Sequence, residues 1–419
     1  MPVGPVEEAI ELFCRTDRAR VLARLVGIVR DFDLAEDSLQ DALLSATTAW
    51  QRDGIPTNPA GWVVTVARRK AVDRLRSLAA TERRQRAWGE LSLSWTSPPD
   101  LEQPIPDDRL RLVFTCCHPA LALEAQVALT LRSLGGLTTE EVARAFFVSD
   151  ATLAQRVVRA KRKIREARID YRVPDREEFP SRLNAVLAVV YLIFNAGYLA
   201  AAGDQLLRVD LCDEAVRLSR VLYDLMPDEP ELLGLAALLC FQDSRRSARV
   251  DASGNAVTLE EQDRSLWDRE EIERGLGLLA RASKAERPGP YQLKAAIAAT
   301  HAETVLARET DWRAIVALYD RLLKLEPSPV VELNRAVAVA MADGPARGLD
   351  LLSEHRLVAA LSSYHLFHLT RADLLRREGR TAEAAEAYRR ANLLTTNLTE
   401  KSFLERRLRE LEATSGPRH

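Results

Sequence analysis

The sequence predicts an all-α protein: two small helical domains, the second a helix-turn-helix, followed by a helical-repeat domain that carries a small β-hairpin insertion. Of the 419 residues, 47% are hydrophobic but only 6% are aromatic, and Ala and Leu dominate, which favours helix packed on helix. Apolar residues recur at three- and four-residue spacing along most of the chain. Clusters of proline and glycine separate these helical stretches into groups.

The breaks between helical stretches suggest the domain boundaries. "SLSWTSPPDLEQPIPDD" contains four prolines and no hydrophobic period, and "YRVPDREEFP" is a second break. We therefore expect a first domain at 1–80, a linker at 81–106, a second domain at 107–172, a short linker at 173–180 and a repeat domain at 181–419.

The first domain reads as three or four helices over residues 5–80. Asp33 is expected to cap the helix that contains "AEDSLQDALLSATTAW", with Glu36 reaching back to complete a capping box. Glycine and prolines mark residues 53–61 as a loop. An amphipathic helix, "WVVTVARRKAVDRLRS", follows this loop.

The second domain has the pattern of a helix-turn-helix. Thr138 and Glu141 form a capping box for a short helix that is expected to end near Phe146. The chain then turns, and Ser149 or Asp150 caps a longer basic helix. A short helix, a tight turn and a longer helix are the elements of a DNA-binding helix-turn-helix.

The basic helix has the composition of a recognition helix. Residues 150–172 contain eight Arg or Lys against three acids, although the net charge of the whole chain is −2. Apolar residues from Leu153 to Ile164 recur at helical spacing and are expected to dock the helix on its own domain. A recognition helix reads bases with its first residues and holds phosphates with later cations. The outward face carries the candidate DNA-contacting residues Thr152, Gln155, Arg156, Arg159 and Lys163. The alternative is a solvated basic helix.

An acidic helix face in the first domain accompanies a second basic segment. Residues 56–86 contain eight Arg or Lys against two acids. In the preceding helix Asp37, Gln40 and Asp41 share one face, with Leu44 beside them. Because DNA phosphates would repel this face, it suits a basic protein surface. An ordinary exposed acidic stripe is the alternative.

Three motifs in order carry a family resemblance: "AEDSLQDALLSATTAW", "NPAGWVVTVARRKAVDRLR" and "LGGLTTEEVARAFFVSDATLAQRVVRAKRKIR". They resemble the two domains of bacterial sigma-70 family factors, most closely the extracytoplasmic-function (ECF) type, over roughly residues 10–172. The resemblance implies an RNA polymerase sigma factor that directs promoter recognition and DNA-templated transcription initiation.

The resemblance also implies site residues. Asp37, Gln40 and Asp41 match positions that bind the β′ clamp helices of RNA polymerase core. The following loop and helix would melt and read the −10 element of promoter DNA, and the recognition helix would read the −35 element. The positions that match the −10 segment are Asn58, Trp62, Arg68, Arg69 and Arg76. Trp62 either stacks on DNA or, more commonly for a Trp at a helix start, packs into the core.

Residues 181–413 read as helical hairpins. The segments 364–394 and 312–341 each fit a tetratricopeptide-type unit, and 221–239 looks like a degenerate third. Residues 248–268 break the pattern, with a turn at Ser253–Asn255 expected between two short strands. "RLNAVLAVVYLIFNAGYLAA" and "EEQDRSLWDREEIERG" resemble the tetratricopeptide-like tail of one ECF subgroup. This implies regulation in cis, with a groove for a protein or peptide partner.

No catalytic, cofactor or metal signature is apparent, so the sequence predicts a non-enzyme without a cofactor. Cys116, Cys117 and His118 are adjacent and cannot all face one ion on a helix, so packing is favoured over metal binding. His365 and His368 are more simply read as core or groove residues. The five cysteines show no framework spacing and are expected to be free thiols.

The most apolar run, residues 185–202, has an unbroken apolar core too short for a bilayer and is expected to be a buried helix. No signal peptide is recognised at the start, which favours a cytoplasmic protein without membrane contact. Two rival interpretations remain: a stand-alone helix-turn-helix regulator with a helical sensor domain, and a helical-repeat enzyme or scaffold with incidental basic helices.

Overall fold

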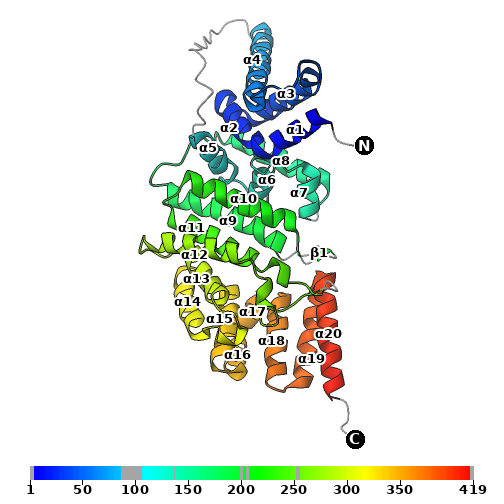
Figure 1. Cartoon of the computed structure of the whole chain (residues 1–419), viewed down its shortest axis with the longest axis vertical. Helices are drawn as coiled ribbons and strands as arrows, with labels where there is room; N and C mark the ends of the chain where they lie inside the picture. The colour runs from blue at the N-terminus through cyan, green and yellow to red at the C-terminus, as the bar shows by residue number, and fades with distance from the viewer. Residues whose placement is uncertain are drawn as a thin grey trace. The chain divides into compact units, whose positions relative to one another are not determined.

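The computed structural model shows an almost entirely α-helical chain that divides into two compact units, Met1–Val190 and Tyr191–His419 (Figure 1). The all-α prediction is confirmed. The structure describes residues 4–85, 106–135, 137–146, 148–198, 202–203, 207–251 and 255–415.

Four helices form the first domain: α1 (Pro5–Thr16), α2 (Arg18–Val29), α3 (Phe32–Asp53) and α4 (Pro59–Gln85). Their apolar stripes meet in a core that includes Leu25, Leu39 and Val63. The expected cap of α3 is wrong by two residues. Asp31 caps the helix, because its Oδ1 accepts a hydrogen bond from the Leu34 amide at 2.9 Å. Asp33 lies inside the first turn instead.

The second domain consists of α5 (Pro106–Cys116), α6 (Leu123–Ser133), α7 (Thr139–Ala145) and α8 (Asp150–Glu166). The predicted capping box at α7 is confirmed: the Thr138 amide donates to Glu141 Oε2 at 2.7 Å, and the Glu141 amide donates to Thr138 Oγ1 at 3.1 Å. Of the expected linker at 81–106, residues 81–85 belong to α4 and Pro106 begins α5. The rest lies outside the described residues.

The second unit is an array of helices, most of them packed on their sequence neighbours, as in repeat proteins (Figure 1). Helix α17 is an exception, because it packs on α15. The division between the units falls inside α9 (Phe179–Tyr198). The following helices are α10 (Val209–Leu225), α11 (Pro230–Asp243), α12 (Arg269–Ser283), α13 (Pro290–Ala302), α14 (Trp312–Leu325), α15 (Pro329–Asp343), α16 (Pro345–Leu352), α17 (His355–Leu361), α18 (His365–Arg377), α19 (Thr381–Leu394) and α20 (Leu398–Ser415).

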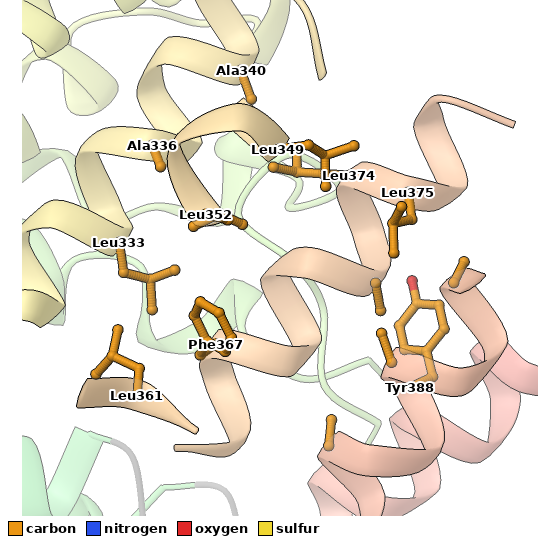
Figure 2. Close-up of a cluster of buried hydrophobic side chains, with 14 of the residues drawn as sticks. Leu333, Ala336, Ala340, Leu349, Leu352, Leu361, Phe367, Leu374, Leu375 and Tyr388 are labelled. Atoms are coloured by element: carbon orange, nitrogen blue, oxygen red, sulfur yellow. The ribbon is translucent and has the colours of Figure 1, made fainter. Parts of the chain in front are cut away.

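The predicted unit at 364–394 forms the helical hairpin α18–α19. Figure 2 shows Tyr388 of α19 facing Leu375 of α18, with Phe367 and Leu352 in the same apolar cluster. Small residues on both helices, such as Ala372 and Ala384, are buried between them. Gly379 turns the chain between the helices at φ 76°, a conformation that side chains disfavour.

The predicted β-hairpin at 248–268 is reduced to an isolated antiparallel bridge between Val250 and Ala256. The Asp251 amide donates to the Asn255 carbonyl at 2.9 Å, and residues 252–254 of the expected turn lie outside the described residues. Two strands that the sequence did not indicate, β1 (Ala202–Gly203) and β2 (Thr396–Asn397), pair in parallel. Two residues are too few to produce an alternating pattern.

Helix α9 is the apolar helix that the sequence singled out. Among the described residues it is the one helix long and apolar enough to cross a membrane. Helices in protein cores meet the same criteria, so a single helix of this kind does not indicate a membrane span. Leu187, Val189 and Ile193 of α9 are fully buried within the protein.

Candidate nucleic-acid interface

Helix α8 presents one apolar face to its own domain and one polar face to solvent. Ser149 caps it by accepting a hydrogen bond from the Thr152 amide at 3.2 Å. Leu153, Val157 and Ile164 are buried. The predicted DNA-contacting residues lie on the opposite side: Thr152, Gln155, Arg159 and Lys163 are exposed and Arg156 is half-buried.

The cations on the outer face of α8 are free for an anionic partner. Within the described residues, no carboxylate lies within 4 Å of Arg156, Arg159 or Lys163. Exposed cations without acidic neighbours produce the positive potential that phosphates require. This face can hold a nucleic-acid backbone while the first turn of α8 approaches the bases.

The loop before α4 and the first turns of α4 form a second polar surface. Asn58 is exposed and acts as a cap, since its Oδ1 accepts from the Gly61 amide at 2.8 Å. Trp62 is half-buried and packs edge-on against Trp50, with ring centroids 5.6 Å apart. Part of its side chain therefore remains accessible. Arg69 is exposed and lies two turns after Trp62 on the same face of α4, whereas Arg68 is half-buried.

Further along α4, Arg76 is exposed and lies 3.8 Å from Asp73 on the same helix. Such an exposed pair contributes little to stability and is easily exchanged for another anion. The structure therefore leaves Arg76 available to a phosphate.

Residues Asp37, Gln40 and Asp41 share one face of α3, as the sequence predicted. Asp37, Gln40 and Leu44 are exposed, and the Leu44 side chain is 62% exposed. A residue that sequence reasoning missed modifies this face: Arg74 of α4 lies 2.7 Å from Asp41 and 3.2 Å from Asp37. Nothing in the spacing within α4 singles out Arg74, because its partners belong to another helix.

A second missed feature joins the two domains. Lys161, on the docking side of α8, is only 9% exposed and lies 2.8 Å from Glu36 and 3.1 Å from Asp33 of α3. Arg165 lies 2.9 Å from the other oxygen of Asp33. Asp33 and Glu36 therefore pair with α8 and do not cap α3. The available signal was Lys161 itself, a cation in the register of the apolar stripe.

Polar contacts elsewhere reinforce this joint. Arg24 of α2 lies 3.0 Å from Asp108 of α5, and both side chains are largely buried. The Tyr171 hydroxyl donates to the Ala23 carbonyl at 2.7 Å and lies 3.1 Å from the Asp108 carbonyl. Burial raises the pKa of Tyr171, so the hydroxyl keeps its proton.

The candidate metal and redox residues are engaged in packing. Within the described ranges, no group of three or more His, Cys, Asp or Glu side chains is placed to hold a metal ion. Cys116 and Cys117 are buried, and burial raises the pKa of Cys117 to about 12, so it is a protonated thiol at neutral pH. His365 and His368 diverge: one lies 3.1 Å from Glu400 and the other 2.9 Å from the Ser362 carbonyl.

A capped short helix, a tight turn and a cation-faced second helix define the class of this protein: it is a DNA-binding protein of the helix-turn-helix type. Comparisons with known proteins narrow the class. Residues 14–81 match the model of Sigma-70 region 2, and residues 111–164 match that of Sigma-70, region 4. Residues 182–283 match a family of unknown function, DUF6596.

Three relatives have similar sequences. An uncharacterized protein of Rhizobium meliloti (strain 1021) is 42% identical over 413 residues, or 96% of each chain. ECF RNA polymerase sigma factor SigK of Mycobacterium ulcerans is 28% identical, covering 38% of this chain and 84% of its own. SigK of Mycolicibacterium vanbaalenii is 30% identical, covering 37% of this chain and 81% of its own.

The chain belongs to the ECF type of the sigma-70 family and carries a long C-terminal extension. It is accordingly a sigma factor for promoter recognition and transcription initiation. Membership of this family, which is not a family of enzymes, implies RNA polymerase core and promoter DNA as partners. Among solved structures, yeast Tom70 matches at a TM-score of 0.38 and 12% identity over 98% of this chain and 84% of its own, too weak a likeness to support an argument.

Proposed function

We propose that this sigma factor divides its work among three surfaces. The outer face of α8 (Thr152, Gln155, Arg156, Arg159 and Lys163) contacts the −35 element. The loop and helix of Asn58, Trp62, Arg68, Arg69 and Arg76 contact the −10 element. The acidic face of α3 (Asp37, Gln40 and Asp41) contacts the β′ clamp helices of the polymerase. The protein acts in the cytoplasm and has no catalytic activity of its own.

The observation that carries this proposal is the separation of charge on one unit. Within the described residues, the outer face of α8 presents cations without carboxylate partners, while α3 presents the exposed Asp37 and the half-buried Asp41 beside an exposed leucine. Phosphates are attracted by the first surface and repelled by the second. A basic protein surface with an apolar centre is complementary to the second surface.

Arg74 adds a mechanism to the polymerase contact. It pairs with both Asp37 and Asp41 in the free protein. A basic clamp helix that reaches these acids competes with Arg74, which is then released on the α4 side, where the proposed −10 contacts lie. Binding of polymerase would thereby add one cation to the surface that meets the displaced DNA strand.

The test is in vitro transcription with purified core polymerase on the gene's own upstream region. We expect a defined transcript from the intact chain and its loss with Asp37→Arg/Asp41→Arg, because both charges on the face are reversed. Asp53→Arg is the control for charge reversal in itself: it reverses one carboxylate at the end of α3, away from the acidic face, and should leave the transcript intact. No transcript from any template, with duplex DNA still bound by the protein alone, would favour a stand-alone regulator.

We also propose that the second unit regulates the sigma domains in cis. Support comes from a relative that is 42% identical over 96% of each chain, which includes most of the extension. Truncation tests this proposal. The cut should follow Val190 as well as Pro174, because Phe179 packs on Phe114 at 5.7 Å between ring centroids and Arg182 donates to the Phe114 carbonyl at 2.6 Å.

A truncated chain that transcribes more strongly than the intact one would mean that the second unit masks the sigma domains. A folded but inactive truncated chain would mean that the second unit is a positive element. Equal transcription by the truncated and intact chains would overturn regulation in cis.

A further inference from the structure

The second unit contains a cavity of about 540 Å³ that the sigma activity does not use. Its wall is formed by the segment Thr258–Arg264, the end of α13, Ala307, Trp312 at the start of α14, and side chains of α15, α18 and α20. The volume lies within the range of small-molecule sites in proteins. From Glu260 onward the segment belongs to "EEQDRSLWDREEIERG", which contains none of the residues of the proposed promoter and polymerase surfaces.

Arg264 is the unusual residue of this wall. It is 4% exposed, yet within the described residues no carboxylate lies within 4 Å of its guanidinium. Its Nη1 donates to the carbonyls of His301 and Thr304 at 2.7 and 3.0 Å and also to Thr304 Oγ1, and its Nη2 donates to Thr310 Oγ1 at 3.2 Å. Nε has no hydrogen-bond partner among these residues. Neutral acceptors satisfy part of its hydrogen bonding but leave its charge uncompensated.

The neighbouring groups make the surroundings of Arg264 more positive. Arg245 and Arg264 both lie over the ring of Trp267, at 5.7 and 4.9 Å from its centroid. Arg245 also has no carboxylate within 4 Å in the described part of the chain, and Glu309 acts on Arg264 only from a longer range. Two cations therefore share one aromatic ring without an ion-pair partner for either.

The other arginines of the cavity wall are already neutralised. Arg376 lies 2.6 Å from Asp373, Arg377 lies 2.5 Å from Glu260, and Arg407 lies 2.5 Å from Glu261. The positive charge that remains for a ligand is therefore that of Arg264.

His301 lines the cavity beside Arg264 and has an unpartnered Nδ1. Burial, together with Arg245 and Arg264, lowers the pKa of His301 to about 4. Its imidazole is thus neutral at physiological pH and offers one hydrogen-bond donor and one acceptor. Trp312 packs edge-on against it, with centroids 5.1 Å apart, and Val337 and Met341 supply apolar wall.

We propose that this cavity is a binding site for a compact organic anion. The carboxylate or phosphate head pairs with Arg264 and accepts a hydrogen bond from it, and the apolar body packs against Trp312, Val337 and Met341. An anion supplies the negative counter-charge that the Arg264 guanidinium lacks, whereas a neutral ligand or water does not. The proposal is independent of whether the second unit regulates transcription.

The experiment measures the melting temperature and the heat of binding of the full chain with phenyl phosphate and with phenylacetate, at constant ionic strength. Phenol and inorganic phosphate are the controls for the apolar body and the charge alone. We expect at least one aromatic anion at millimolar concentration to raise the melting temperature by a few degrees, with phenol giving no shift. A shift with phenyl phosphate alone assigns a phosphate head, and one with phenylacetate alone assigns a carboxylate.

Two variants locate the site. Arg264→Gln should abolish the shift, but it also removes contacts to the end of α13. Val337→Trp fills the cavity from a half-buried position and leaves those contacts intact, so it should abolish the shift in a folded protein. Val330→Trp, on the exposed side of the same helix, should retain the shift. No shift with either anion, an equal shift with phenol, or an undiminished shift in Val337→Trp would overturn the proposal.

Discussion

The joint between the two sigma domains and the core of the helical repeats are stabilised by different chemistry. At the joint, Lys161 meets Asp33 and Glu36 in a largely buried ion-pair cluster. In the repeats, residues from Leu333 to Leu411 form a continuous apolar cluster (Figure 2). Opening a polar joint returns charges to water, whereas opening an apolar core exposes hydrocarbon. The joint therefore contains charges that water can solvate once it opens, whereas the repeat core contains none in this cluster.

The largest effect should come from the repeat core. Phe367→Ala removes a side chain that is 2% exposed in the cluster, and should lower the free energy of unfolding of the second unit by about 3–5 kcal/mol. Urea denaturation of the full chain measures this change. Leu393→Ala, at a position 77% exposed, should change the free energy by less than about 0.5 kcal/mol. Equal losses in the two variants would contradict an apolar core at this place.

The second effect is a pH dependence of the stability of the repeats. The pKa of His301 is about 4 in the folded protein and 6.5 in an unperturbed histidine. Because the unfolded state binds the proton more strongly, the stabilisation is complete above pH 6.5 and is lost as the pH falls toward 4. The loss approaches about 3 kcal/mol. Denaturation at several pH values should show it, and His301→Gln should show a smaller slope in this window.

A smaller effect is expected at the joint. Lys161→Met removes a nearly buried cation and leaves Glu36 without its partner, which should weaken the joint by about 1–3 kcal/mol. Hydrogen exchange at the first turn of α3 measures the opening. Adding Glu36→Leu should recover much of the loss, because a matched apolar pair often replaces a buried ion pair. If the double variant opens as readily as the single one, charge pairing is not what closes the joint.

The smallest effect belongs to the exposed part of the same joint. Arg165 pairs with Asp33, but its side chain is 59% exposed. Arg165→Ala should weaken the joint by less than about 1 kcal/mol, and the difference should disappear at high salt. The same hydrogen-exchange measurement, made at low and high ionic strength, checks both statements. A loss as large as that of Lys161→Met would mean that Asp33, not Glu36, is the main partner.

The sequence alone determined what depends on local periodicity and capping. The spacing from Leu153 to Ile164 placed the outer residues of α8 on one exposed face, and Thr138 with Glu141 marked the start of α7. The alternation of small and bulky residues around Ala372 and Tyr388 likewise indicated the α18–α19 hairpin. These features need only neighbours three or four residues apart, so one segment contains the whole signal.

Only the tertiary structure decided which charges meet. Lys161 is 125 residues from Glu36, and Arg74 is 33 residues from Asp41. Arg264 donates to carbonyls at and just after the end of α13, and no acid of the described residues lies within 4 Å of it. The chain carries 59 basic and 61 acidic residues, so almost any cation has many acids as candidate partners. Each exposed ion pair contributes less than about 1 kcal/mol to stability, so these energies alone do not select the partner of a cation. Helix packing selects it, because packing brings particular charges within reach of one another.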